Sequence, residues 1–170
     1  MNMREALRPF LIPLVIALLA TLLGHGLGVA FGVAEDSLKG TLQASADAAL
    51  ADKYGGDATK AKSVVDKSWT YMKRAHMHAG ALGNGALLLS LLLAFLGDAR
   101  LRLRQAVAMG SAVGALGYGL FWMVAAFAAP GLGGTGAAKE SYAWLGLPTA
   151  GLVVAGTVAA LALVIAALRK

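Results

Sequence analysis

Four long uncharged runs alternate with charged segments along the 170-residue chain. The runs span residues 9–34, 75–97, 105–129 and about 145–168. A helix needs about 20 apolar residues to cross the hydrocarbon core of a bilayer, and each run reaches that length. The pattern predicts an all-α integral membrane protein, a single membrane domain in which four transmembrane helices form a bundle with both termini on one side. Pro13 predicts a kink or late start in the first helix, and Pro148 is expected in the first turn of the fourth.

A polar segment, residues 35–72, separates the first two runs and is too long for a plain connection. Four apolar residues recur in it at the spacing of one helical stripe: Leu38, Leu42, Ala46 and Leu50. Tyr54-Gly55-Gly56-Asp57 interrupts this helix, and a second helix is predicted to begin near Asp57 or Thr59 and to continue into the second run. We interpret the segment as an extramembrane helical hairpin that caps the outer end of the bundle, with a solvated loop as the alternative.

Composition agrees with a membrane protein. Hydrophobic residues make up 58% of the chain and charged residues 14%, whereas about a quarter of a soluble domain is charged. Much of the net charge of +6 flanks the apolar runs, which indicates contact with the lipid bilayer and not with nucleic acid. The chain has no cysteine, which excludes a disulfide framework, a thiolate metal site and a haem attached through C-x-x-C-H.

The distribution of cations predicts the orientation. The flanks expected on the side of the termini carry seven cations and two acids, and the opposite side carries eight cations and seven acids over many more residues. Lys and Arg are enriched in cytoplasmic flanks of membrane helices. Both termini are therefore predicted to be cytoplasmic, in the inner membrane of a bacterium. Lys73 and Arg74 run against this pattern, because they flank the second run on the proposed outer side.

Glycines repeat at helix-packing spacing in three of the runs. They are Gly24, Gly28 and Gly32, then Gly80, Gly83 and Gly85, then Gly110, Gly114 and Gly117. Small residues at this spacing let the backbones of membrane helices approach closely. The pattern predicts tight packing within the chain. It also fits a contact between copies, in a homo-oligomer, or with other subunits of a larger membrane complex.

All three histidines of the chain lie in the outer halves of the first two runs: His25, His76 and His78. Ionisable side chains inside a membrane are costly and commonly functional. On an ideal helix His76 and His78 point about 200° apart. We therefore expect only one of the pair to share a site with His25, while the other faces a different neighbour.

Three chemistries fit these histidines. The first is b-type haem, held by the imidazoles of His25 and of either His76 or His78. The second is copper or another transition metal bound by the three histidines, with methionine nearby. The third is a histidine that responds to protons or hydrogen-bonds a quinone. The alternative is that the histidines have no chemical role and are packing residues at the membrane interface. Further residues expected to bind or orient a cofactor are Lys73, Arg74 and Asn84.

Residues His76 to Gly83 follow the pattern H-x-H-x-x-x-L-G. This stretch resembles the openings of membrane helices in haem proteins related to the catalytic subunit of haem–copper oxidases and nitric oxide reductases. In that superfamily such histidines bind low-spin haem or lie at the outer membrane face, so the resemblance implies haem binding by His76 or His78. The superfamily has many more spans than four, and the resemblance does not extend to oxidase activity.

The sequence thus predicts a membrane-embedded b-type haem protein for electron transfer or for redox or gas sensing, and not an enzyme on its own. Two alternatives stay open. One is a non-catalytic structural or accessory subunit that packs through its glycine faces, and the other is a copper-binding membrane protein. No H-E-x-x-H, G-x-S-x-G or P-loop motif occurs in the chain.

Overall fold

The computed structural model describes residues 2–97 and 100–169, and these are helical nearly throughout, with no strand among them. The helices are α1 (Met3–Leu7), the 3-10 turn η1 (Arg8–Phe10), α2 (Leu11–Ala48), α3 (Leu50–Tyr54), α4 (Ala58–Phe95), α5 (Leu101–Ala128), α6 (Thr135–Ser141) and α7 (Ala143–Leu168). Four stretches are long and apolar enough to cross a membrane: Met3–Ala48, α4, α5 and α7. The predicted all-α fold with four helices that could span a membrane is confirmed.

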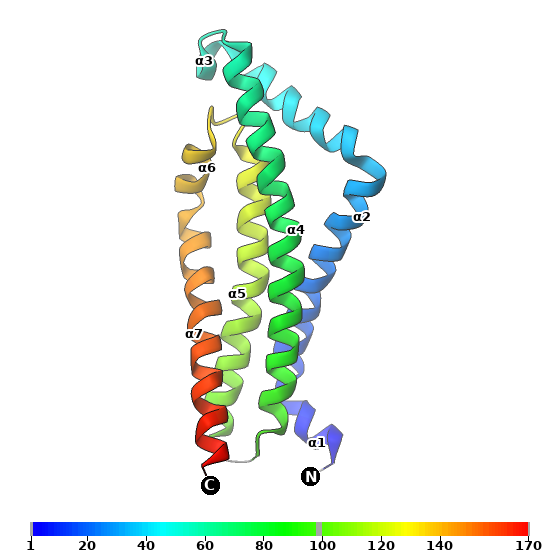
Figure 1. Ribbon diagram of the computed structural model, residues 1–170, viewed down its shortest axis with the longest axis vertical. Helices are drawn as coiled ribbons and strands as arrows, with labels where there is room; N and C mark the ends of the chain where they lie inside the picture. The colour runs from blue at the N-terminus through cyan, green and yellow to red at the C-terminus, as the bar shows by residue number, and fades with distance from the viewer. Residues whose placement is uncertain (1, 98–99, 170) are drawn as a thin grey trace.

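The four long helices run up and down side by side, and both termini lie at one end of the molecule (Figure 1). α4 packs against α2 and α5, α5 also packs against α2, and α7 packs mainly against α5. In their most apolar stretches, 56% of α5 is buried but only 17% of α7. The fourth helix is therefore peripheral, and most of its surface is free to contact lipid.

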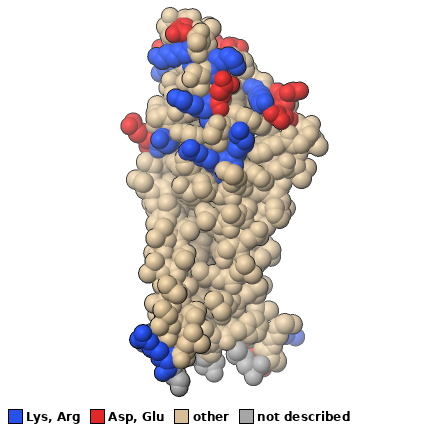
Figure 2. All heavy atoms as spheres, viewed as in Figure 1, with Lys and Arg blue, Asp and Glu red and all other residues tan. Residues whose placement is uncertain are grey.

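α2 bends at Ala34, which has non-helical backbone angles (φ −139°, ψ 23°) at the end of the first apolar run. Beyond the bend, α2 leans over the body and forms a hairpin with α3 and the first half of α4 (Figure 1). We call the end of the molecule that carries this hairpin the outer end. On the face shown in Figure 2, charged groups gather on the hairpin and at the opposite end, and an uncharged band lies between them.

The hairpin has its own small core, in which Leu42 and Ala46 pack with Tyr54, Ala61 and Val65. The apolar stripe predicted for this segment is therefore its buried face. Gly55 and Gly56 make the turn with positive φ (63° and 82°), and the side chain of Asp57 accepts a hydrogen bond from the Lys60 amide to cap α4. α4 then continues without interruption to Phe95, as the sequence predicts.

Two expectations near the helix starts have different outcomes. The chain is already helical from Met3, so the first helix does not start late, but η1 interrupts it just before α2 begins at Leu11, and Pro13 lies in the first turn of α2. α7 begins at Ala143 and Pro148 lies inside it, so the expected place of Pro148 in the first turn is wrong. α6 was not expected in the glycine-rich tract before α7, and buried Ala138 holds it on the core formed with α4 and α5.

Candidate functional site

α2 and α4 meet backbone to backbone at glycines in the outer half of the uncharged band. Gly24 lies against Gly80, and a methyl group added at Gly24 would overlap the Gly80 backbone. One turn farther in, a Cβ at Gly83 would lie 2.6 Å from the amide nitrogen of Thr21. The predicted tight packing within the chain is confirmed at these positions.

His76 faces α2 across this seam. Its Nδ1 lies 2.7 Å from the carbonyl oxygen of Gly24. Because a carbonyl only accepts, Nδ1 carries the proton and donates, which leaves the lone pair of a neutral ring on Nε2. The ring lies over Gly28, where a Cβ would come within 2.8 Å of Cε1, and it meets the ring of Phe31 edge-on with centroids 5.6 Å apart.

His78 faces α5, on the other side of α4. Its ring centroid lies 5.0 Å from that of Tyr118 and 6.0 Å from that of Trp122, on which it stacks. One turn outward, the guanidinium carbon of Arg74 lies 4.9 Å from the Trp122 ring centroid and 5.4 Å from that of Tyr71. We call these five residues the outer aromatic cluster. The predicted divergence of His76 and His78 is confirmed.

His25 and Asn84 lie at the exposed edge of the seam between α2 and α4. The side chain of His25 is exposed, one helical turn outward of Thr21 on the same face of α2. The Thr21 hydroxyl donates to Oδ1 of Asn84 at 3.2 Å, yet Asn84 is itself exposed. We call the surface around His25 and Asn84 the α2–α4 flank. Lys73 is also exposed, at the outer border of the uncharged part of α4.

The three histidines do not converge on one centre. Within residues 2–97 and 100–169, no three His, Asp or Glu side chains form a group that could hold a metal ion. The contact of Gly24 with Gly80 also closes the seam between the helices that carry His25 and His76, so no gap remains there for a flat macrocycle. The geometry does not favour a cofactor between α2 and α4, and haem and copper binding stay predictions of the sequence.

The outer aromatic cluster is the grouping that sequence reasoning missed. Lys73 and Arg74 were expected to bind or orient a cofactor, whereas Arg74 stacks on two aromatic rings. A usable signal was present: Arg74 and His78 are four residues apart, and so are Tyr118 and Trp122. Residues four apart share a helix face, but which faces of α4 and α5 meet depends on both helices.

Comparisons of the chain with protein-family models, with curated proteins and with solved structures found no match. The resemblance to the haem–copper oxidase superfamily therefore has no support beyond residues His76 to Gly83. Evidence on function comes from the geometry alone.

Proposed function

We propose that this chain is a non-catalytic accessory membrane protein, which associates laterally with a second copy of itself through the α2–α4 flank and presents its hairpin outside the membrane. The observation that carries the proposal is the exposure of Asn84 within the uncharged run 75–97 of α4. A polar side chain that faces hydrocarbon has no water to bond, so asparagine in membrane helices commonly bonds to another helix.

Asn84 suits a symmetric contact. Within the described residues its side chain has one hydrogen bond, which it accepts from Thr21. An amide group carries two donor hydrogens and an acceptor oxygen. In a two-fold contact the same patch meets itself, so two copies of Asn84 can bond each other across the axis. His25 lies one turn outward on the same flank and adds a second polar group to the contact.

The hairpin has the features of a segment at the membrane surface. Lys39 forms an ion pair with Glu35, and its ammonium nitrogen lies 5.1 Å from the ring centroid of Trp69. Lys62 pairs with Asp66 at 3.5 Å. Tryptophan beside a cation is typical of the boundary between lipid and water. In this proposal the bend at Ala34 marks where α2 leaves the membrane, and both termini lie in the cytoplasm of a bacterium.

Oligomeric mass in detergent or in lipid nanodiscs tests the assembly. We expect a dimer for the native chain and, for Asn84→Leu, a dissociation constant about tenfold higher, since hydrogen bonds between membrane helices contribute about 1–2 kcal/mol in model peptides. Thr157→Val is the matched control, because Thr157 is an exposed polar residue of α7 whose hydroxyl bonds its own helix at Val153. A native chain that stays monomeric at all concentrations, or an unchanged Asn84→Leu dimer, overturns the proposal.

The same preparation tests the cofactor predictions. Reduced b-type haem gives a sharp Soret band and α band, and bound copper is measured by metal analysis. A colourless, metal-free dimer agrees with the proposed accessory role. A stoichiometric haem spectrum would replace this proposal with electron transfer or sensing, and loss of the spectrum in His76→Ala but not in His25→Ala would separate the two candidate ligands.

A further inference from the structure

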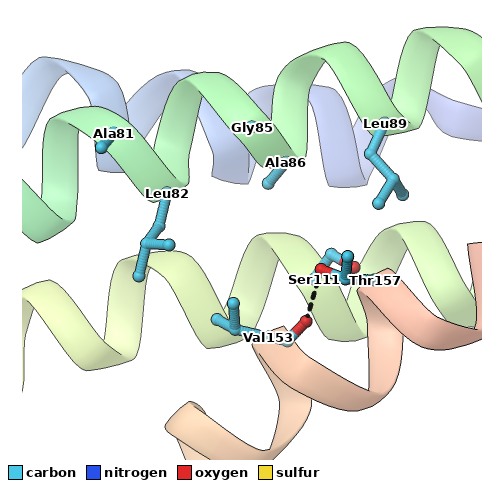
Figure 3. A pocket seen from close by; sticks show the side chains of 8 residues that line it. All are labelled: Ala81, Leu82, Gly85, Ala86, Leu89, Ser111, Val153 and Thr157. Atoms are coloured by element: carbon cyan, nitrogen blue, oxygen red, sulfur yellow. Dashed lines mark hydrogen bonds between the residues drawn. The ribbon is translucent and has the colours of Figure 1, made fainter.

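A groove runs along α4 on the side away from α2. Its walls are α4 and α7 and its floor is α5, and its volume is about 210 Å³. Figure 3 shows Leu82, Leu89 and Val153 around it. α4 and α7 make few direct contacts. Gly85 keeps the groove open, since a Cβ built at this position would meet nothing within 4 Å.

The outer aromatic cluster lies outward of this groove along the same face of α4. On α4, Arg74, His78, Leu82 and Leu89 recur at helical spacing and lie on one face. On α5, Ser111 lines the groove and Tyr118, seven residues farther along, contacts His78. From His78 to Leu89 the helix rises roughly 16 Å. A single molecule can therefore reach from the charged outer end into the middle of the uncharged band.

The outer end of this path carries an uncompensated positive charge. The Arg74 guanidinium stacks on Tyr71 and Trp122. Within the described residues, the ion pairs are Lys39 with Glu35 and Lys62 with Asp66, and neither includes Arg74. A stacked guanidinium is held in place and still offers its N–H groups to an anion. Phosphate oxygens are preferred partners for such a group.

The inner end holds a polar group without a partner. Ser111 is 5% exposed, and its hydroxyl has no hydrogen-bond partner among the described residues. Gly156 of α7 lies against this hydroxyl so closely that a Cβ there would overlap it. Apart from Ser111 and the exposed Thr157, the groove is lined by aliphatic side chains and Gly85, which suits an alkyl chain.

We propose that this groove binds one anionic phospholipid. The phosphate contacts Arg74 beside His78 at the outer end, and one acyl chain lies along the groove between α4 and α7 as far as Ser111. Charge selects the head group, and the length and apolar lining of the groove select a long alkyl chain. The site lies on the opposite side of α4 from His76 and is independent of the proposed dimer contact.

Native mass spectrometry of the full chain, titrated with phosphatidylglycerol or phosphatidylcholine of identical acyl chains, tests the proposal. We expect one phosphatidylglycerol per chain, bound about tenfold more tightly than phosphatidylcholine, because the choline cation of phosphatidylcholine offsets the phosphate charge that attracts Arg74. Arg74→Gln should abolish this preference. Lys73→Gln, which removes the neighbouring exposed cation, should keep it.

Two further comparisons separate a built site from general attraction to cations. Gly85→Leu fills the groove at a position with free space, and it should weaken phosphatidylglycerol binding about tenfold while the thermal midpoint stays unchanged. Phosphatidylglycerol with short acyl chains should bind more weakly than the long-chain lipid. Equal losses in Arg74→Gln and Lys73→Gln, or no effect of Gly85→Leu and of chain length, overturn the proposal. Tight binding of a neutral quinone with no dependence on Arg74 would overturn it as well.

Discussion

At the scale of single residues, glycines with the same sequence spacing have different structural roles. Gly24 lies against the backbone of α4, while Gly28, four residues on, makes room for the imidazole of His76. Gly26 and Gly32 have nothing within 4 Å of a Cβ position. Spacing identifies the helix face that carries small residues, but the environment of each glycine depends on the rotation of both helices about their axes.

Gly24→Ala tests the seam. The added methyl overlaps the Gly80 backbone, which cannot move without shifting α4, and overpacking of this kind costs about 1–3 kcal/mol. We expect the free energy of unfolding in detergent to fall by that amount. Gly26→Ala is the matched control on the same helix, and it should be neutral or stabilising by up to about 1 kcal/mol, because alanine has the higher helix propensity. Equal effects of the two substitutions would show that the glycine contact does not hold α2 on α4.

At the scale of elements, the hairpin rests on the outer end of α5 through a few contacts. The hydroxyl of buried Tyr54 donates to the carbonyl oxygen of Pro130 at 2.7 Å. Beside it, Gly131 lies against the Ser45 hydroxyl and Gly133 against the side chain of Lys53. These contacts join the turn of the hairpin to the connection between α5 and α6, so the hairpin is held in a fixed position against the helix bundle.

Tyr54→Phe tests this attachment of the hairpin. The substitution leaves a buried carbonyl without its donor, which costs about 1–3 kcal/mol. We expect faster hydrogen exchange in α3 and the adjoining turn, with little change in the inner halves of α5 and α7. Tyr142→Phe, at a half-buried tyrosine of the α6–α7 junction, is the control.

The same residue gives the hairpin a pH dependence. Burial raises the pKa of Tyr54 above its ordinary value of 10.0, because the charged phenolate is poorly solvated there. A group with a raised pKa in the folded state stabilises fully below its unfolded pKa and loses that contribution as pH rises through the folded value. Amide exchange is itself base-catalysed, so the quantity to compare is the protection factor, and protection of the hairpin amides should fall above about pH 10. This alkaline step should be absent in Tyr54→Phe, and its persistence there would assign it to another group.

Local signals predicted the elements well, and contacts between elements poorly. The turn at Gly55 and Gly56 and the start of α4 after Asp57 follow from glycine and capping chemistry, which act within a few residues. The divergence of His76 and His78 follows from helix geometry. The exposure of His25 does not follow from the geometry of one helix, since it depends on how α2 is rotated against α4. α6 is stabilised mainly by the packing of Ala138 on the core. No apolar periodicity in the sequence predicts this contact.

At the scale of the whole molecule, the two proposed surfaces occupy different sides of α4. His76 and Asn84 contact α2, whereas His78 and Leu82 lie toward α5 and α7. Substitutions on one side leave the other side intact, so dimer formation and lipid binding can fail separately. Both surfaces lie within or at the border of the uncharged runs of the sequence, which fixes their depth relative to the charged ends.

The orientation of the molecule follows from those charged ends and can be measured directly. The chain has no cysteine, so Asp52→Cys on the exposed surface of α3 and Arg169→Cys beside the C-terminus each introduce a single thiol. The end with the termini carries cations with few acids, which favours the cytoplasm. We expect a membrane-impermeant maleimide to label Asp52→Cys in intact bacterial cells and Arg169→Cys only after the membrane is permeabilised. The reverse pattern would place the hairpin in the cytoplasm, and the site of Arg74 would then face the inner leaflet. Labelling of just one of the two variants in intact cells excludes a mixed insertion, and labelling of both after permeabilisation is the control that both thiols are reactive, because both positions are exposed in the folded chain.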